Sequence, residues 1–229
     1  MGTTPPAAAI RLGDAALEAR PAGTLYWPAE RLLVVADLHL GRAERMARRG
    51  APLLPPYETR ATLERLEAEI AATAPCAVVC LGDSFDDLEA AAGLADALAP
   101  RLARLAAGRR WVWAAGNHDP GPVGLPGEHV TFLTLGALRL RHVAGALAPG
   151  EVEVSGHYHP KASLCRRGVK ITRRCFLVDR RRAILPAFGT YTGGLDVNDA
   201  ACRGLVGPDA RALIVGTRVT PVPLARLAA

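Results

Sequence analysis

The feature that most constrains the fold is a series of short apolar runs that end in polar or glycine residues. Three of them, Leu32–Ala36, Ala77–Leu81 and Trp111–Ala115, are each five residues long. Runs of this length, bounded by turn-forming residues, are typical of buried β-strands. Further runs of strand length follow in the second half of the chain, at Val130–Leu135, Ala137–Arg141, Val152–Ser155, Cys175–Val178 and Leu213–Val219.

Two longer segments with helical periodicity separate the first three predicted strands. Thr59–Ala74 repeats apolar side chains at helical spacing, and Pro75 ends that segment. Asp87–Ala107 follows the same pattern, although Pro100 should kink or split this helix. The alternation of strands and helices predicts a parallel α/β arrangement for the first half, whereas the second half reads as strands joined by short turns.

Length and composition favour one domain over residues 1–229. Half of the 229 residues are hydrophobic and 22% are charged, which is enough to bury a core and excludes a disordered chain. The formal charge of +6 suits an acidic partner such as nucleic acid. No apolar run predicts a membrane span, and the first residues do not resemble a secretory signal. Five cysteines without a Cys-x-x-Cys pair indicate a reducing compartment, so we expect a cytoplasmic protein without a membrane partner.

Five of the six histidines lie in short polar clusters that follow predicted strands. In open α/β sheets, ligands bind at the carboxyl ends of the strands, which is where these clusters fall. The clusters are Asp37-Leu38-His39, Gly82-Asp83, Gly116-Asn117-His118-Asp119, the single His142, and Gly156-His157-Tyr158-His159. The sequence therefore predicts one functional site assembled from several strand ends.

The residue types in these clusters suit transition-metal ions. Carboxylate, imidazole and amide oxygen together favour Mn, Fe or Zn over Ca, which prefers oxygen ligands only. One tetrahedral ion takes about four protein ligands, whereas two ions that share a carboxylate use a larger set. The seven candidate ligands are Asp37, His39, Asp83, Asn117, His142, His157 and His159. We therefore expect two divalent ions as cofactors.

The order of the clusters resembles the calcineurin-like metallophosphoesterase superfamily, whose motif blocks are all present between residues 37 and 159. The resemblance implies an α/β fold in which two mixed β-sheets form a sandwich flanked by helices. It also implies that His118 is the general acid of a phosphoester hydrolysis and Asp119 its partner. It assigns Asp37, His39, Asp83 and His159 to a first metal, and Asp83, Asn117, His142 and His157 to a second, with Asp83 bridging.

The flanking residues resemble a narrower group, the bacterial ligase-associated DNA damage response endonucleases. The similar segments are Asp37–Arg42 followed by Arg48, Arg49, Gly50 and Pro52, and Leu185–Gly189 followed by Gly193 and Gly194. The resemblance implies manganese as the working ion and DNA as the substrate. It also implies a repair pathway shared with an ATP-dependent DNA ligase, a helicase and a nuclease-like protein.

The chain departs from that group directly after Gly82-Asp83. The group often has a histidine there, whereas this chain has Ser84-Phe85-Asp86-Asp87. Asp86 and Asp87 would either accept hydrogen bonds from a ligand histidine or cap the following helix. The cap is the favoured prediction.

Basic residues cluster after the last histidine block. The segment from Lys161 to Arg182 has nine basic residues and one acidic residue, Asp179. Such a surface attracts phosphates without reading sequence, although a solvated hairpin in an arginine-rich chain has the same composition. The candidate nucleic-acid contacts are Arg166, Arg167, Lys170, Arg173 and Arg174.

Three residues of the metal blocks are candidates for binding the substrate directly: Arg42, Asn117 and His118. Arg42 is close enough in sequence to Asp37 to grip a substrate phosphate with its guanidinium fork. The alternative for Arg42 is an ion pair with Glu44 or another carboxylate.

These observations favour a dinuclear-metal phosphoesterase that hydrolyses DNA, as an endonuclease or phosphodiesterase of DNA repair. A phosphatase or phosphodiesterase for small molecules such as nucleotides would use the same metals and a different pocket. A non-catalytic scaffold ranks last, because such proteins typically lose metal-site histidines and this chain keeps every predicted ligand together with His118.

Overall fold

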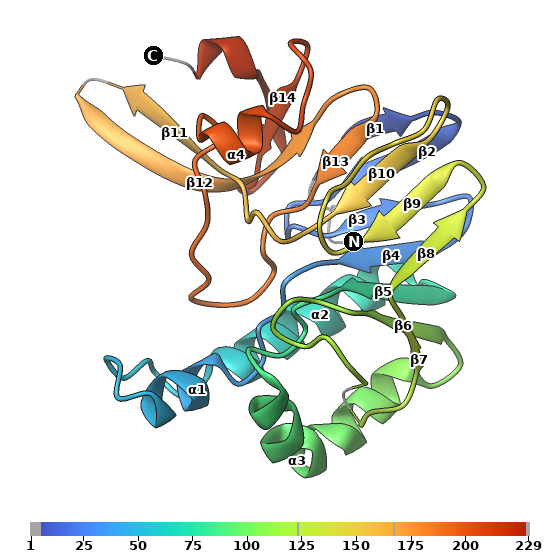
Figure 1. The fold of residues 1–229 in the computed structure, drawn as a ribbon, viewed down its shortest axis with the longest axis vertical. Helices are drawn as coiled ribbons and strands as arrows, with labels where there is room; N and C mark the ends of the chain where they lie inside the picture. The colour runs from blue at the N-terminus through green and yellow to red at the C-terminus, as the bar shows by residue number, and fades with distance from the viewer. Residues whose placement is uncertain (1–5, 123, 167, 228–229) are drawn as a thin grey trace.

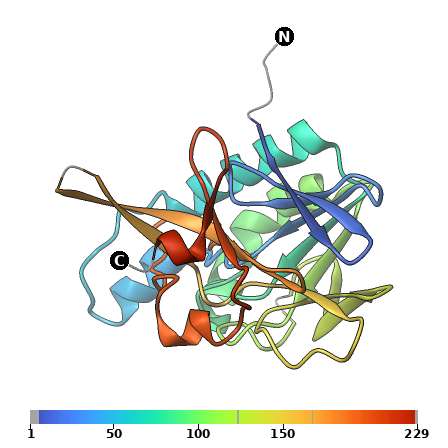
Figure 2. The same cartoon turned by 90° about the horizontal axis from the view of Figure 1, so that it is seen from above.

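The structure is a computed structural model that describes residues 6–122, 124–166 and 168–227. Two β-sheets lie face to face, and helices cover their outer faces (Figure 1; Figure 2 gives the view from above). Each sheet contains both parallel and antiparallel pairs. The predicted sandwich of two mixed sheets flanked by helices is therefore confirmed.

The first sheet has seven strands in chain order. They are β1 (Ala8–Leu12), β2 (Ala15–Ala19), β3 (Leu25–Trp27), β4 (Leu32–Val35), β5 (Ala77–Leu81), β6 (Arg110–Ala114) and β7 (Glu128–Val130). Strands β1 to β4 form an antiparallel meander, and β4 to β7 are parallel. The parallel part agrees with the predicted strand–helix–strand order, whereas β1 to β3 were not expected.

Helices α2 (Glu58–Thr73) and α3 (Leu88–Ala106) connect the parallel strands and pack on the outer face of the first sheet (Figure 1). Asp87 caps α3 by accepting a hydrogen bond of 2.7 Å from the backbone N–H of Ala90. The helix continues through Pro100, so the predicted split is wrong. Burial of its apolar face against the sheet stabilises the helix and offsets the loss of the backbone hydrogen bond that proline cannot donate. A short helix, α1 (Arg42–Arg48), follows β4.

The second sheet runs in the order β15-β14-β12-β13-β10-β9-β8, and β11 pairs with β12 alone. The strands are β8 (Phe132–Leu135), β9 (Leu138–Arg141), β10 (Val152–Ser155), β11 (Lys161–Arg166), β12 (Val169–Val178), β13 (Arg182–Ile184), β14 (Arg211–Ile214) and β15 (Thr220–Pro223). Helix α4 (Ala200–Arg203) and the 3₁₀ helix η1 (Leu224–Arg226) pack on its outer face. The β11–β12 hairpin projects from the body of the molecule in both views (Figures 1 and 2).

The predicted strand Cys175–Val178 is the end of the longer β12, and two other predicted strands do not correspond to single strands. The run Val130–Leu135 contains a break at Thr131, where the chain passes from the first sheet to the second. Strand β7 pairs with β6 and β8 pairs with β9, and the residue types of this short run do not reveal which neighbour each part pairs with. Likewise, Leu213–Val219 is the end of β14 and the turn before β15.

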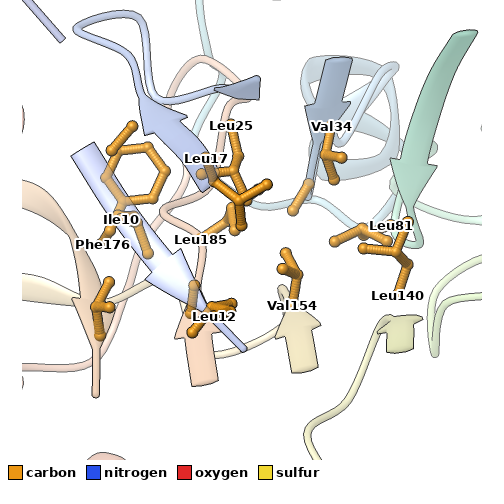
Figure 3. Close-up of a cluster of buried hydrophobic side chains, with 14 of the residues drawn as sticks. Ile10, Leu12, Leu17, Leu25, Val34, Leu81, Leu140, Val154, Phe176 and Leu185 are labelled. Carbon is orange, nitrogen blue, oxygen red and sulfur yellow. The ribbon is translucent and has the colours of Figure 1, made fainter. Parts of the chain in front are cut away.

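The main core lies between the two sheets. Leu17, Val34 and Leu81 from the first sheet meet Val154 and Phe176 from the second, and each is at most 3% exposed (Figure 3). This apolar layer fixes how the sheets pack, and therefore where their strand ends meet. None of the helices in the described ranges is both long and apolar enough to span a membrane.

Candidate metal centre

The carboxyl ends of five strands supply the predicted ligands. Asp37, Asp83 and Asn117 follow β4, β5 and β6 of the first sheet, while His142 and His157 follow β9 and β10 of the second. The strands within each set are parallel to one another, so their carboxyl ends lie at the same edge. The structure brings the two sets together, as the following contacts show.

The first group consists of Asp37, His39 and His159, whose ligand atoms all lie within 4.8 Å of one another. Nε2 of His159 lies 3.3 Å from Oδ1 of Asp37 and 3.4 Å from Nε2 of His39. Asp37 and His39 are buried, and His159 is partly exposed. One carboxylate and two imidazoles in this arrangement can hold a divalent transition metal.

The second group consists of Asp83, His142 and His157, which satisfy the same distance limit. Nε2 of His142 lies 3.3 Å from Oδ2 of Asp83, and the amide oxygen of Asn117 lies 2.8 Å from both His142 Nε2 and His157 Nδ1. Asp83 Oδ2 is also 3.9 Å from Nε2 of His39 in the first group. Asp83 therefore lies between the two groups, and all seven predicted ligands converge.

The hydrogen-bond partners of His142 and His118 show which ring nitrogen carries the proton. Nδ1 of His142 lies 2.9 Å from the carbonyl oxygen of Leu81, and Nδ1 of His118 lies 2.7 Å from that of Asp86. A carbonyl oxygen only accepts hydrogen bonds, so each Nδ1 carries the proton and a neutral ring presents the lone pair of Nε2. Nε2 of His142 faces the oxygens of Asn117 and Asp83, so either a second proton on Nε2 or a cation between these atoms would remove the repulsion between their lone pairs.

The electrostatics of the site also favour positive charge. Burial lowers the pKa of His142, but the hydrogen bond with Asp83 and the charges of Asp37 and Asp83 outweigh burial and raise it. Burial raises the pKa of Asp83, yet its contacts with His142 and with the backbone of His118 bring the pKa down to about 2. A buried carboxylate whose pKa is lowered beside imidazoles fits the requirements of a divalent ion.

The backbone at the ligands is strained. Eight non-glycine residues of the described chain have a positive φ, and five of these are predicted ligands. They are Asp37 at 55°, His39 at 46°, Asp83 at 46°, His157 at 72° and His159 at 47°. Such conformations cost of order 1–3 kcal/mol each and persist where the surroundings fix them, most often at functional sites.

Hydrogen bonds between the loops hold these conformations. The carboxylate of Asp37 accepts from the backbone N–H of His157 at 3.0 Å, and that of Asp83 accepts from the backbone N–H of His118 at 2.9 Å. Gly116 permits this approach, because a Cβ there would lie 2.1 Å from the backbone nitrogen of Asp83.

The prediction that the carboxylate of Asp119 orients His118 is wrong. Asp119 is buried, and its oxygens accept hydrogen bonds from the backbone N–H groups of Asp83, Ser84, Phe85 and Gly116, at 2.7 to 3.1 Å. Burial and the nearby charge of Asp83 raise the pKa of Asp119 to about 6. Asp119 thus shapes the loop that carries Asp83, and the carbonyl of Asp86 holds the imidazole of His118 instead.

The structure separates the roles of Asp86 and Asp87. Asp87 caps α3, as favoured, but the cap prediction is wrong for Asp86. The fully buried carboxylate of Asp86 lies 2.8 Å from Nδ1 of His39, 3.0 Å from Nη1 of Arg42 and 2.9 Å from Nη1 of Arg45. Arg42, predicted to grip the substrate, therefore has the alternative role of an ion-pair partner in this structure.

A pocket of about 260 Å³ opens beside His118. Arg45 and Arg49 line it together with Asp86, Asp87, Asn117 and His118. Sequence reasoning missed these two arginines as pocket residues. Arg45 lies three residues after Arg42 in α1, and Arg49, seven residues after it, is the C-cap of that helix. This spacing was the available signal for a basic helix face next to the metal blocks.

The predicted nucleic-acid contacts are only partly described by the structure. Lys170 and Arg173 are exposed on β12, whereas Arg174 is half-buried and donates to the carbonyl oxygen of Ala187 at 2.7 Å. Arg167 and the side chain of Arg166 lie outside the described residues. Contact of this strand with nucleic acid stays a prediction.

Comparison with known proteins agrees with the geometry. A family model described as calcineurin-like phosphoesterase matches residues 30–169, so the chain belongs to this family of metal-dependent phosphoester hydrolases. Its fold is similar to the crystal structure of the Pseudomonas putida nuclease MPE, at 29% sequence identity and a TM-score of 0.75. That match covers 94% of this chain and all of the nuclease chain. A comparison with curated proteins found no significant match.

Proposed function

We propose that the protein is a phosphodiesterase that cuts DNA, with two divalent ions, manganese in the working enzyme, held by the seven predicted ligands. The position of Asp83 between the two ligand groups carries this proposal, because a carboxylate there can be shared by two ions. The similar nuclease structure supports nucleic acid as the substrate class. Action in cytoplasmic DNA repair, beside an ATP-dependent ligase, a helicase and a nuclease-like protein, is part of the same proposal.

The chain's own residues provide positioning and proton transfer. When bound, a pair of divalent ions would polarise the phosphoryl oxygens and supply a nucleophile derived from water. His118 lines the pocket, and the carbonyl of Asp86 holds the proton on Nδ1, so the proton for the leaving oxygen is a second one, carried on Nε2 in the imidazolium form of the ring. Arg49 is exposed at the same pocket and suits a substrate phosphate better than Arg42, whose guanidinium is engaged by Asp86.

The pocket beside His118 is small and polar, which suits a phosphate group more than an enclosed apolar ligand. Sites that enclose small molecules typically measure about 300–1,000 Å³. The pocket of about 260 Å³ beside His118 lies below this range and is lined by polar and charged residues. The convergence of all seven ligands argues against a non-catalytic scaffold.

The test is hydrolysis by protein stripped with a chelator and reloaded with Mn, Mg, Fe or Zn. Circular single-stranded DNA, nicked duplex, a free nucleotide and bis(p-nitrophenyl) phosphate serve as substrates. We expect Mn-dependent cleavage of circular DNA and of the small diester, and loss of both in Asp83→Asn. Hydrolysis of the nucleotide alone would replace the proposal with the small-molecule phosphatase, and no hydrolysis with any metal would reject both.

A further inference from the structure

A second polar cavity, of about 570 Å³, lies outside the metal centre. It is bounded by the base of the β11–β12 hairpin and by the segment that connects β13 to α4. Its lining includes Pro21, Lys161, Thr172, Arg173, Arg174 and Thr192. None of the predicted metal ligands lines it, so it is a separate feature of the surface.

The hairpin turns a basic face towards this cavity. In the strand register, Lys161 lies opposite Arg174, and Ser163 opposite Thr172. Residues paired across two strands, and residues two apart along a strand, point to the same side of a sheet. This face therefore presents two cations and, at the next pair along the hairpin, the hydroxyl groups of Ser163 and Thr172, which lie 2.9 Å apart. The hydroxyl of Ser163 also donates to the carboxylate of Asp196 at 3.0 Å. Arg173 alternates to the other face of β12 and lines the cavity as well.

The cations at this cavity have no carboxylate partners in the described chain. Lys161, Arg173 and Arg174 form no ion pair there, and neither does Arg65, which lies near Arg174. Arg174 donates to the carbonyl oxygen of Ala187 and Arg65 to that of Phe188. Burial lowers the pKa of both guanidinium groups, and the charge of Arg174 contributes to bringing that of Arg65 down to about 10. Desolvated cations that repel one another would be stabilised by an anion.

The segment held by these two arginines is bonded directly to the metal centre. The backbone N–H of Phe188 donates to the carbonyl oxygen of Ala36 at 2.9 Å, and that of Gly189 donates to the carbonyl oxygen of Asp37 at 2.9 Å. Lys161 is two residues after the ligand His159, so their Cα atoms are at most about 7 Å apart. A nucleic-acid strand bound at the metal centre would therefore reach this cavity within a few nucleotides.

We propose that this cavity binds the phosphodiester backbone of the nucleic-acid substrate a few nucleotides away from the bond that is cut. The inference rests on the proposed function, since it extends the substrate of that site. Guanidinium forks and hydroxyl groups are the usual partners of backbone phosphates. The described lining has no aromatic side chain on which a base could stack, so the contact is independent of sequence.

The experiment measures binding in the presence of a chelator, so that no substrate is cut. Fluorescent single strands of 2, 6 and 12 nucleotides, as DNA and as RNA, are titrated against the whole protein and against the double variant Lys161→Gln/Arg173→Gln. The control Arg104→Gln/Arg180→Gln removes the same charge from exposed positions elsewhere. For the 12-mer at 0.15 M salt we expect about a tenfold loss of affinity, and a salt slope lower by about 1.4, from two lost phosphate contacts.

The length series and a second ligand decide between the alternatives. The dinucleotide should bind the variant and the wild type equally, because it is too short to span both sites. Equal affinity of both double variants for the 12-mer, or binding of phosphatidylglycerol vesicles without binding of either oligonucleotide, would overturn the inference. Manganese-dependent hydrolysis of bis(p-nitrophenyl) phosphate by the wild type, measured separately, tests the proposed function; if that fails while the 12-mer result holds, the cavity binds nucleic acid in a protein of another activity.

Discussion

Two fully buried carboxylates in this molecule, Asp86 and Glu153, each lie against two arginines. Asp86 contacts Arg42 and Arg45, whose side chains are 24% and 20% exposed. Glu153 contacts Arg141 and Arg182, whose side chains are 22% and 15% exposed. The charge, the burial and the number of partners are nearly the same in the two clusters.

Their positions along the strands differ, and the contacts differ accordingly. Glu153 lies within β10, and its arginines come from the neighbouring strands β9 and β13, so this cluster joins three strands. Asp86 lies beyond the carboxyl end of β5, where its side chain meets the ligand His39 and its carbonyl oxygen meets His118. One kind of ion-pair cluster thus links neighbouring strands at one place and contacts a predicted metal ligand at the other.

The largest expected effect is a loss of kcat on removal of His118, whose ring is held by the backbone carbonyl of Asp86. Replacing His118 with alanine should lower kcat on DNA by about 10²- to 10⁴-fold, because the general acid is lost. The loss should be much smaller with p-nitrophenyl esters, whose leaving group departs without a proton. The measurement is kcat on both substrates at saturating manganese, with His129→Ala as the control histidine outside the site. An equal loss on both substrates would remove the acid role from His118.

The second effect concerns the Glu153 cluster. Glu153→Gln leaves Arg141 and Arg182 without their buried counter-charge, and we expect the free energy of unfolding to fall by about 3 kcal/mol, the lower end for a broken buried pair because both arginines keep some solvent contact. Denaturant unfolding measures this change, and calorimetric titration should show unchanged manganese affinity. A clear loss of manganese affinity would mean that the two clusters are not separate in function.

The third effect concerns the side chain of Asp86. Asp86→Asn should lower manganese affinity by about 10- to 100-fold, as is typical when the group that orients a ligand histidine is removed. The matched control is its neighbour, because Asp87→Asn keeps an amide oxygen that can cap α3 and does not touch a ligand. Unchanged metal affinity in Asp86→Asn would show that Asp86, like Glu153, contributes to stability and not to metal binding.

The smallest expected effect is a loss of stability on removal of the Asp87 side chain, which caps α3. Asp87→Ala removes the oxygen that accepts from the N–H of Ala90, and loss of such a cap costs about 1 kcal/mol of stability. The melting temperature should fall by a few degrees while kcat and metal affinity stay at wild-type values. A loss of activity beyond the loss of folded protein would show that Asp87 acts in the pocket that it lines.

The sequence was sufficient to predict the strand ends and the convergence of the candidate ligands that follow them. Leu32–Ala36 and Ala77–Leu81 are continuous apolar runs because those strands are buried on both faces, and the polar residues after each run mark the carboxyl ends. Carboxylates and histidines at several such ends predict a metal site before any contact is known.

The partners of Asp86 and Asp119 could not be predicted in the same way. Both residues contact loops that are distant in sequence, Asp86 at His39 and Asp119 at the loop after β5, and only packing decides which loops meet. The passage of the chain from the first sheet to the second at Thr131 was not predicted for a similar reason. Pairing with different neighbouring strands does not change the residue types of a short segment.

The origin of the ligands in both sheets has a thermodynamic consequence. Asp37 and Asp83 belong to one layer and His142 and His157 to the other, so cations between them would tie the layers together at one end. Saturation with a metal at 100 times its dissociation constant adds about 2.7 kcal/mol to stability when the unfolded chain does not bind it. Chelation would then loosen the joint between the layers as a whole, and resistance to heat would follow the supply of the ion.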